Sequence, residues 1–265
     1  MRIFTPTDGR ARGVYLDIRG GGFCLDSAAR GDVRNRELAE ALHIAVVSVD
    51  YRLAPERPWP AAPDDCAAAA RWLVEHAEAR FGSSRLAIGG SSAGATLALA
   101  TLLRLRDRGA VDGFTGAVLQ FGTYDLSGQT PAGRRIADEF FIQAYVGPVA
   151  DRTASDVSPI FGDLRGLPPA LLVVGSTDVL LEDNLALAGR LAAAGNDGEL
   201  RIYPESPHGF TSHPTAMART ALRGIDSWLL ERFAQPSDRS LDGDHAALRR
   251  VTGTDHPETT NGPRR

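Results

Sequence analysis

The stretch Leu86-Ala-Ile-Gly-Gly-Ser-Ser-Ala-Gly-Ala-Thr-Leu-Ala-Leu-Ala100 decides the fold. It begins with a short apolar run, passes through a cluster of small residues, and continues as an Ala- and Leu-rich pattern typical of a buried helix. Within it, Gly90-Ser-Ser-Ala-Gly94 fits the pattern Gly-x-Ser-x-Gly with Ser92 at its centre. A strand-to-helix turn of this kind presents one serine hydroxyl above the edge of a sheet. The pattern therefore indicates Ser92 as a candidate nucleophile.

A glycine-rich junction without chemistry is the alternative interpretation, because so short a pattern also recurs by chance. Ser91 does not fit as the nucleophile, since Ala93 would then occupy the position of the second glycine. The choice between the two interpretations depends on the other motifs of the chain.

The rest of the chain alternates between strand and helix patterns. The predicted strands cover residues 2–5, 13–18, 44–49, 86–88, 116–121, 168–175 and 199–203. The predicted helices cover residues 35–42, 65–81, 93–107, 138–145, 180–194 and 217–233. This alternation predicts an α/β fold with a mostly parallel central sheet and helices on both faces. We expect one domain over residues 1–234, with an insertion at about 125–158, and a disordered tail over 235–265.

Composition excludes several classes of protein. The chain has 265 residues, 43% of them hydrophobic, and a net charge of −4, which argues against nucleic acid as a partner. Every basic side chain other than histidine is an arginine, so no lysine-dependent mechanism is available. Cys24 and Cys66 lack metal-ligand spacing, and no apolar leader or membrane-length run is present. These features predict a cytoplasmic protein.

Three further sites follow predicted strands. Gly20-Gly-Gly22 leaves several backbone N–H groups free to converge on one point. Asp178 and His208 follow the last two strands of the predicted parallel sheet. Taken singly, Asp178 could be a helix N-cap and His208 a surface-loop histidine. Together with Ser92 they supply the nucleophile, base and acid that an activated serine needs, all at one edge of the sheet.

With these motifs together, the chain resembles the hormone-sensitive-lipase-like bacterial carboxylesterases of the α/β hydrolase fold. Three motifs carry the resemblance over roughly residues 2–233: Gly20-Gly-Gly-Phe23, Asp50-Tyr-Arg-Leu-Ala-Pro-Glu56 and Gly90-Ser-Ser-Ala-Gly94. The segments Asp178-Val-Leu-Leu-Glu-Asp183 and Pro207-His-Gly-Phe210 resemble the acid and histidine segments of the family.

The resemblance implies a role for each matching residue. Ser92 is expected to be the nucleophile, His208 the base and Asp178 the acid of a catalytic triad. The backbone N–H groups of Gly21, Gly22 and Ala93 are expected to form the oxyanion hole. Arg19 and Phe23, on either side of the glycines, are added as candidate substrate contacts, although Arg19 does not match the family.

The chain departs from the family pattern in three places. Arg19 replaces the usual histidine before the glycines, and either braces the glycine loop or pairs with a substrate carboxylate. Ser91 replaces the usual acidic residue before the nucleophile. The usual N-terminal cap elements do not precede Arg2, so we expect a reduced cap and an open pocket.

The resulting prediction is a serine esterase that hydrolyses short-chain carboxylic esters through an acyl-enzyme. It needs no cofactor and no metal, and its partner is a small-molecule ester; a homodimer is left open. Two alternatives also stay open, namely acyl transfer or macrocyclisation by the same triad, and a non-catalytic small-molecule-binding protein.

Overall fold

The computed structural model describes residues 1–234, and all statements below concern this part of the chain. The predicted tail, residues 235–265, lies outside it. The strands are β1 (Arg2–Phe4), β2 (Val14–Ile18), β3 (Ala45–Val49), β4 (Leu86–Ser91), β5 (Phe114–Gln120), β6 (Ala170–Gly175) and β7 (Gly198–Tyr203). The α-helices are α1 (Asp32–Leu42), α2 (Ala61–Phe81), α3 (Ala93–Arg106), α4 (Pro131–Ile136), α5 (Phe140–Val146), α6 (Leu181–Ala193) and α7 (Ala216–Ala234).

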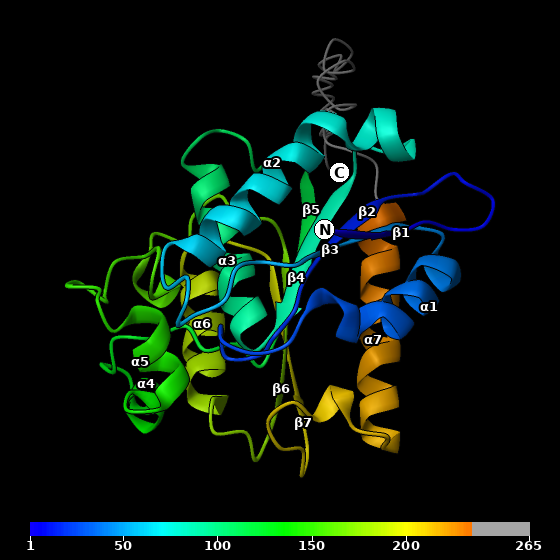
Figure 1. Ribbon diagram of the computed structural model, residues 1–265. Coiled ribbons are helices and arrows are strands. Elements are labelled where there is room, and N and C mark those ends of the chain that lie inside the picture. Colours follow the sequence, from blue (N-terminus) through cyan, green and yellow to red (C-terminus); the bar gives the residue numbers. More distant parts are fainter. Residues whose placement is uncertain (235–265) are drawn as a thin grey trace, which may run out of the picture. The chain divides into compact units, whose positions relative to one another are not determined.

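The strands form one sheet in the order β1-β3-β2-β4-β5-β6-β7. Only β1 runs antiparallel to its neighbour, and all other pairs are parallel. Figure 1 shows α2, α3 and α6 on one face of the sheet and α1 and α7 on the other. This arrangement confirms the predicted α/β fold with helices on both faces.

Apolar side chains on both faces of the sheet explain its position at the centre of the molecule. β3 is Ala-Val-Val-Ser-Val and is buried at every residue, as expected for a strand covered by helices on both sides. One core lies between the sheet and α2, α3 and α6, and a second lies between the sheet and α1 and α7. None of the helices in the described part of the chain has the length and apolar composition of a membrane span.

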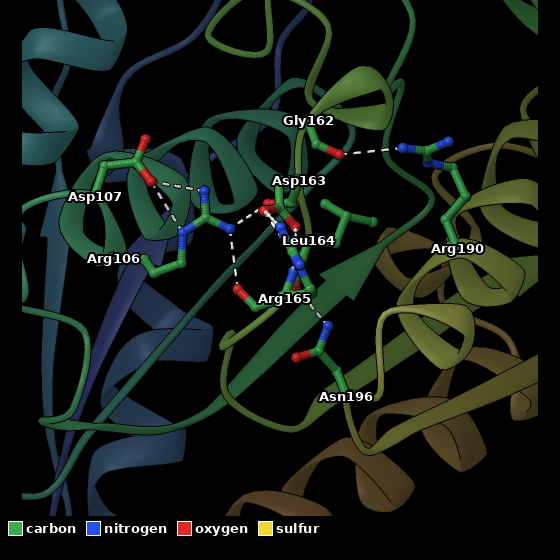
Figure 2. A network of polar contacts seen from close by, with 8 residues as sticks. All are labelled: Arg106, Asp107, Gly162, Asp163, Leu164, Arg165, Arg190 and Asn196. Atoms are coloured by element: carbon green, nitrogen blue, oxygen red, sulfur yellow. Dashed lines mark hydrogen bonds and ion pairs between the residues drawn. The ribbon is translucent and has the colours of Figure 1, made fainter.

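The segment between β5 and β6 contains α4, α5 and a short 3-10 helix, Pro159–Phe161. Sequence analysis predicted a single helix here, over 138–145, and missed α4. Figure 2 shows how the end of this segment is fastened. Arg106, at the end of α3, donates to the carbonyl oxygen of Arg165 at 3.0 Å, and Arg190 of α6 donates to that of Gly162 at 3.1 Å. The return of the chain to β6 is therefore anchored to two core helices.

Candidate active site

The turn between β4 and α3 holds Ser92 in a conformation that few residues adopt. Its backbone has φ 53° and ψ −123°, in the left-handed half of conformational space, where a side chain causes strain. The N–H of Ser92 donates to the carbonyl oxygen of Gln120 at the end of β5, at 2.8 Å. This bond fixes the turn against the neighbouring strand, and the side chain of Ser92 remains partly exposed.

His208 and Asp178 lie beside Ser92. The Nε2 atom of His208 is 3.0 Å from the hydroxyl oxygen of Ser92, and its Nδ1 atom is 3.0 Å from Oδ2 of Asp178. The side chain of Asp178 is fully buried, whereas that of His208 is 38% exposed. The structure thus joins three residues from three loops in one hydrogen-bonded chain, in the order that the sequence predicted.

Asp178 also binds the backbone just before α6. Its Oδ1 atom accepts a hydrogen bond from the N–H of Leu180 at 2.8 Å, just before α6 begins. A buried carboxylate with backbone and imidazole donors stays in place while it faces the histidine. Asp178 therefore holds the turn that precedes α6 and orients His208 at the same time, but it is not the N-cap of α6, which is Leu180.

The loop Gly20-Gly21-Gly22 lies next to the serine turn. A Cβ atom on Gly20 would stand 2.8 Å from the carbonyl oxygen of Ser91, so only glycine permits this approach. No acceptor within residues 1–234 binds the backbone N–H groups of Gly21, Gly22 or Ala93. These three donors are the ones that the sequence assigned to an oxyanion hole.

Arg19 braces this loop from behind. Its guanidinium donates to the carbonyl oxygens of Leu25 at 2.6 Å, Gly20 at 3.3 Å and Tyr51 at 3.4 Å, and its side chain is only 9% exposed. The guanidinium also lies over the ring of Tyr51, 4.2 Å from its centroid. Of the two roles considered for Arg19, these contacts match the scaffold and leave little surface for a substrate.

Tyr51 is a second brace, and its role was not predicted from the motif Asp50–Glu56 in which it lies. Its hydroxyl donates to the carbonyl oxygens of Arg19 at 3.1 Å and Gly20 at 3.3 Å. Burial raises the pKa of the Tyr51 hydroxyl well above its usual value, which favours the protonated form that donates these bonds. Arg19 and Tyr51 together support the carbonyl side of the glycine loop.

Phe23 does not lie where the sequence placed it. It was expected to contact substrate, but its side chain is completely buried and stacks on Tyr145 of α5 at 4.0 Å between ring centroids. Its backbone has a positive φ of 64°. A buried ring has no surface for a ligand, so we correct the assignment: Phe23 joins the glycine loop to α5.

Comparison with known proteins matches this architecture. A family model described as alpha/beta hydrolase fold matches residues 15–212. The carboxylic ester hydrolase LipN of Mycobacterium tuberculosis is 34% identical over 225 residues, which cover 79% of this chain and 60% of LipN. Ethyl acetate hydrolase of Pseudomonas putida is 32% identical over 224 residues, which cover 79% of this chain and 70% of that protein.

The chain thus spans less than two thirds of the length of LipN. A solved structure of a hormone-sensitive lipase from a metagenome library is 36% identical, with a TM-score of 0.77, and the match covers 86% of this chain and 80% of that one. The family model covers most of the described residues. The glycine loop and the serine turn, two of the motifs on which the resemblance was based, lie side by side at the edge of the sheet. The chain belongs to the hormone-sensitive-lipase-like esterase family of the α/β hydrolase fold.

Proposed function

We propose that this protein is a serine carboxylesterase that hydrolyses short-chain carboxylic esters through an acyl-enzyme. The observation that carries the proposal is the unbroken hydrogen-bonded chain Asp178–His208–Ser92, with 3.0 Å at each imidazole nitrogen. A serine hydroxyl is a weak nucleophile, and such a chain is the arrangement that activates it.

In the proposed mechanism, Nε2 of His208 accepts the hydroxyl proton of Ser92 as the oxygen attacks the ester carbonyl. The buried carboxylate of Asp178 faces Nδ1, keeps that nitrogen protonated in the neutral ring and stabilises the imidazolium that forms. His208 then donates its proton to the leaving alcohol. A water molecule repeats the sequence on the acyl-enzyme and releases the acid.

The negative charge on the carbonyl oxygen is assigned to the N–H groups of Gly21, Gly22 and Ala93. These groups have no acceptor within the described residues, and Ala93 is the first residue of α3, where the helix dipole favours negative charge. In comparable sites, loss of one donor lowers kcat by about 10²–10³-fold. The bracing by Arg19 and Tyr51 keeps two of the donors in place.

The segment at about 125–158 is proposed as a small cap beside the site. The ring of Phe141, on α5, lies against Gly22: a Cβ atom on that glycine would stand 3.1 Å from the ring. The partial exposure of His208 indicates an open approach, which suits short acyl chains. The relative named ethyl acetate hydrolase supports the same size class.

The exposure of His208 also favours hydrolysis over acyl transfer. Because 38% of the His208 side chain is exposed, water reaches the base that must activate it in the second step. The contacts of Ser92, His208 and Asp178 also favour catalysis over a non-catalytic binding role, which would not require an aligned triad.

Location and partners belong to the same proposal. Cys24 and Cys66 are both free thiols, which favours a reducing compartment such as the cytoplasm. A net charge of −4 supports a small ester, rather than nucleic acid, as the partner.

A fluorophosphonate probe tests the proposal directly, because it reacts only with an activated serine. The folded chain should be labelled at Ser92, as found by peptide mapping, and should hydrolyse p-nitrophenyl acetate. The Ser92→Ala variant should take up no probe. Folded protein that neither takes up the probe nor hydrolyses the ester would instead support a binding role.

A further inference from the structure

Gln120, the last residue of β5, makes two hydrogen bonds that lead to different parts of the proposed triad. Its backbone carbonyl oxygen accepts from the N–H of Ser92 at 2.8 Å. Its side-chain Oε1 accepts from the hydroxyl of Thr211 at 3.0 Å. Thr211 follows His208 by three residues, so one residue contacts both the nucleophile's turn and the base's loop.

The loop that carries His208 is tied on both sides, to the loop after β6 and to β5. Before His208, the carbonyl oxygen of Ser206 accepts from the N–H of Thr177 at 3.2 Å. After His208, the other hydrogen bonds of residues 209–213 are local, such as that from the N–H of Ser212 to Gly209 at 3.0 Å. Within residues 1–234, the Thr211–Gln120 bond is the hydrogen bond that ties this second half to the sheet.

Apolar packing completes the support but does not replace that bond. The ring of Phe121 meets the His208 ring edge to face, with 5.2 Å between centroids and 74° between planes. Phe210 is buried and packs on Phe121. Such contacts are not directional enough to set the imidazole along the line from Asp178 to Ser92, whereas a hydrogen bond of defined length restrains the loop in that direction.

Turnover makes this restraint necessary. When His208 carries the proton, its Nε2–H must turn from the serine oxygen toward the leaving oxygen, so the hydrogen bond with Ser92 alone does not fix the ring. The ring must nevertheless return the proton to the leaving alcohol and later accept one from water. A displacement of about 1 Å in such a relay costs up to about 10²-fold in rate.

We propose that Gln120 is a positioning residue that couples Ser92 and His208, with its side chain acting through Thr211. The inference rests on the proposed esterase function. It assigns Gln120 no contact with substrate: its carbonyl holds the nucleophile's turn, and its amide oxygen holds the loop of the base.

Two nearly isosteric substitutions test the side-chain bond. Thr211→Val removes the donor, and Gln120→Met removes the acceptor but keeps the backbone carbonyl that holds Ser92. Each should lower kcat on p-nitrophenyl acetate and the rate of fluorophosphonate labelling roughly ten-fold, with KM changed less than about two-fold. The double variant should be no slower than either single one, because the two residues share one interaction.

Thr211→Ser keeps the hydroxyl and should restore both rates to within about two-fold of the original chain. Thr220→Val, on the exposed surface of α7, makes the same chemical change away from the site and is the matched control. Thermal midpoints should lie together for all variants, which separates positioning from loss of folding.

The outcomes distinguish this inference from the function on which it rests. An original chain that takes up no probe contradicts the esterase proposal, and this inference with it. Labelling that is equally fast in the original chain and in Thr211→Val contradicts the positioning role alone. A loss that follows the thermal midpoint and is not restored by Thr211→Ser also contradicts it, since the bond would then be merely structural.

Discussion

The carbonyl oxygen of Ile18 lies 1.9 Å from the point where a Cβ atom on Gly94 would stand. Ile18 ends β2 and Gly94 is the second residue of α3, so the helix begins directly against the backbone of the neighbouring strand. A Cβ atom on Gly90 would meet the same oxygen at 2.2 Å. The two glycines that flank Ser92 therefore allow the serine turn to lie against the strand that leads into the glycine loop.

This contact predicts that Gly94→Ala destabilises the protein, although alanine is the better helix former. The backbone cannot move aside as a flexible side chain can, so we expect a loss of about 1–3 kcal/mol in the free energy of unfolding. Gly189→Ala is the matched control: it lies in α6, where a Cβ atom would meet nothing within 4 Å, and should stabilise by up to about 1 kcal/mol. Urea unfolding measures both, and equal stability of Gly94→Ala and the original chain would contradict the packing argument.

The triad should behave as one unit. Ser92→Ala should abolish turnover of p-nitrophenyl acetate, a loss on the order of 10⁴-fold or more in kcat, and His208→Ala should do nearly the same. The double variant should be little worse, because neither residue acts alone. Ser91→Ala changes the adjacent serine and should retain most of the activity. Substantial residual turnover in Ser92→Ala, with its fold intact by circular dichroism, would exclude Ser92 as the nucleophile.

If Arg19 only braces the glycine loop, its substitution should change kcat/KM by the same factor for every ester substrate. Its guanidinium donates to three backbone carbonyls and not into the pocket. Arg19→His restores the residue usual in the family, and if this histidine also braces the loop, kcat/KM on a neutral short ester should be kept or raised. The ratio of that value to the one for a matched hemi-ester with a free carboxylate should not change. Arg30→His, at an arginine whose side chain is 71% exposed, is the control. A loss of about 1.5–3 kcal/mol confined to the hemi-ester would instead assign Arg19 to substrate binding.

Local sequence patterns were sufficient for the main elements and for the order of the candidate site residues. Periodicity and glycine spacing predicted β4, the serine turn and α3, because the cause of each lies within a few neighbouring residues. α2 begins at Ala61, four residues before its predicted start at Asp65, because Pro63 favoured a loop, whereas proline is tolerated in the first turn of a helix. α4 was missed because six residues are too few for a periodic pattern, although Thr130 followed by Pro131 is a helix-start signal.

The remaining features depend on contacts that no local pattern contains. Phe23 follows the glycine loop and was assigned to substrate, but its buried side chain stacks on the distant ring of Tyr145. Gln120 and Thr211 are 91 residues apart, and neither belongs to a motif. Their pairing follows from the neighbouring positions of β5 and the loop after β7, which only the folded sheet defines.

Acyl-chain length tests the open site. Long chains gain about 0.8 kcal/mol per CH₂ only where apolar surface covers them, and His208 is 38% exposed. We therefore expect kcat/KM to be highest for p-nitrophenyl esters of about two to six carbons and to fall for longer chains. Measurements below the critical micelle concentration avoid aggregation of the substrate. A higher kcat/KM on a long-chain ester would contradict the open site and assign α5 to a substantial apolar lid.

Asp183 of α6 is fully buried and lies against the start of the proposed cap. Because its carboxylate is buried, we expect it to make the free energy of unfolding depend on pH. Its Oδ1 accepts from the hydroxyl of Thr130 at 2.8 Å, and its Oδ2 accepts from the N–H groups of Tyr124 at 3.2 Å and Asp125 at 3.3 Å. Burial nevertheless outweighs these donors and raises the pKa of Asp183 above its usual value. The folded chain therefore holds this proton at a higher pH than the unfolded chain does. The contribution of this group to stability is then largest below the unfolded pKa and declines as pH rises through the folded pKa.

Removing the Thr130 hydroxyl should deepen that decline, because it takes away a donor that stabilises the charged form. Thr130→Val should lower the free energy of unfolding more toward pH 8, where rising pH favours the charged form of Asp183, than toward pH 4, where the protonated form is favoured. The N-cap bond from the N–H of Gly133 to Thr130, at 2.9 Å, is lost at both pH values and adds a constant offset. Thr115→Val is the control, since Thr115 donates to the carbonyl oxygen of Leu86 at 3.1 Å and its loss should not depend on pH. Urea unfolding across this range measures the difference, and a loss in Thr130→Val that is equal at both ends would show that the hydroxyl does not stabilise the charge on Asp183.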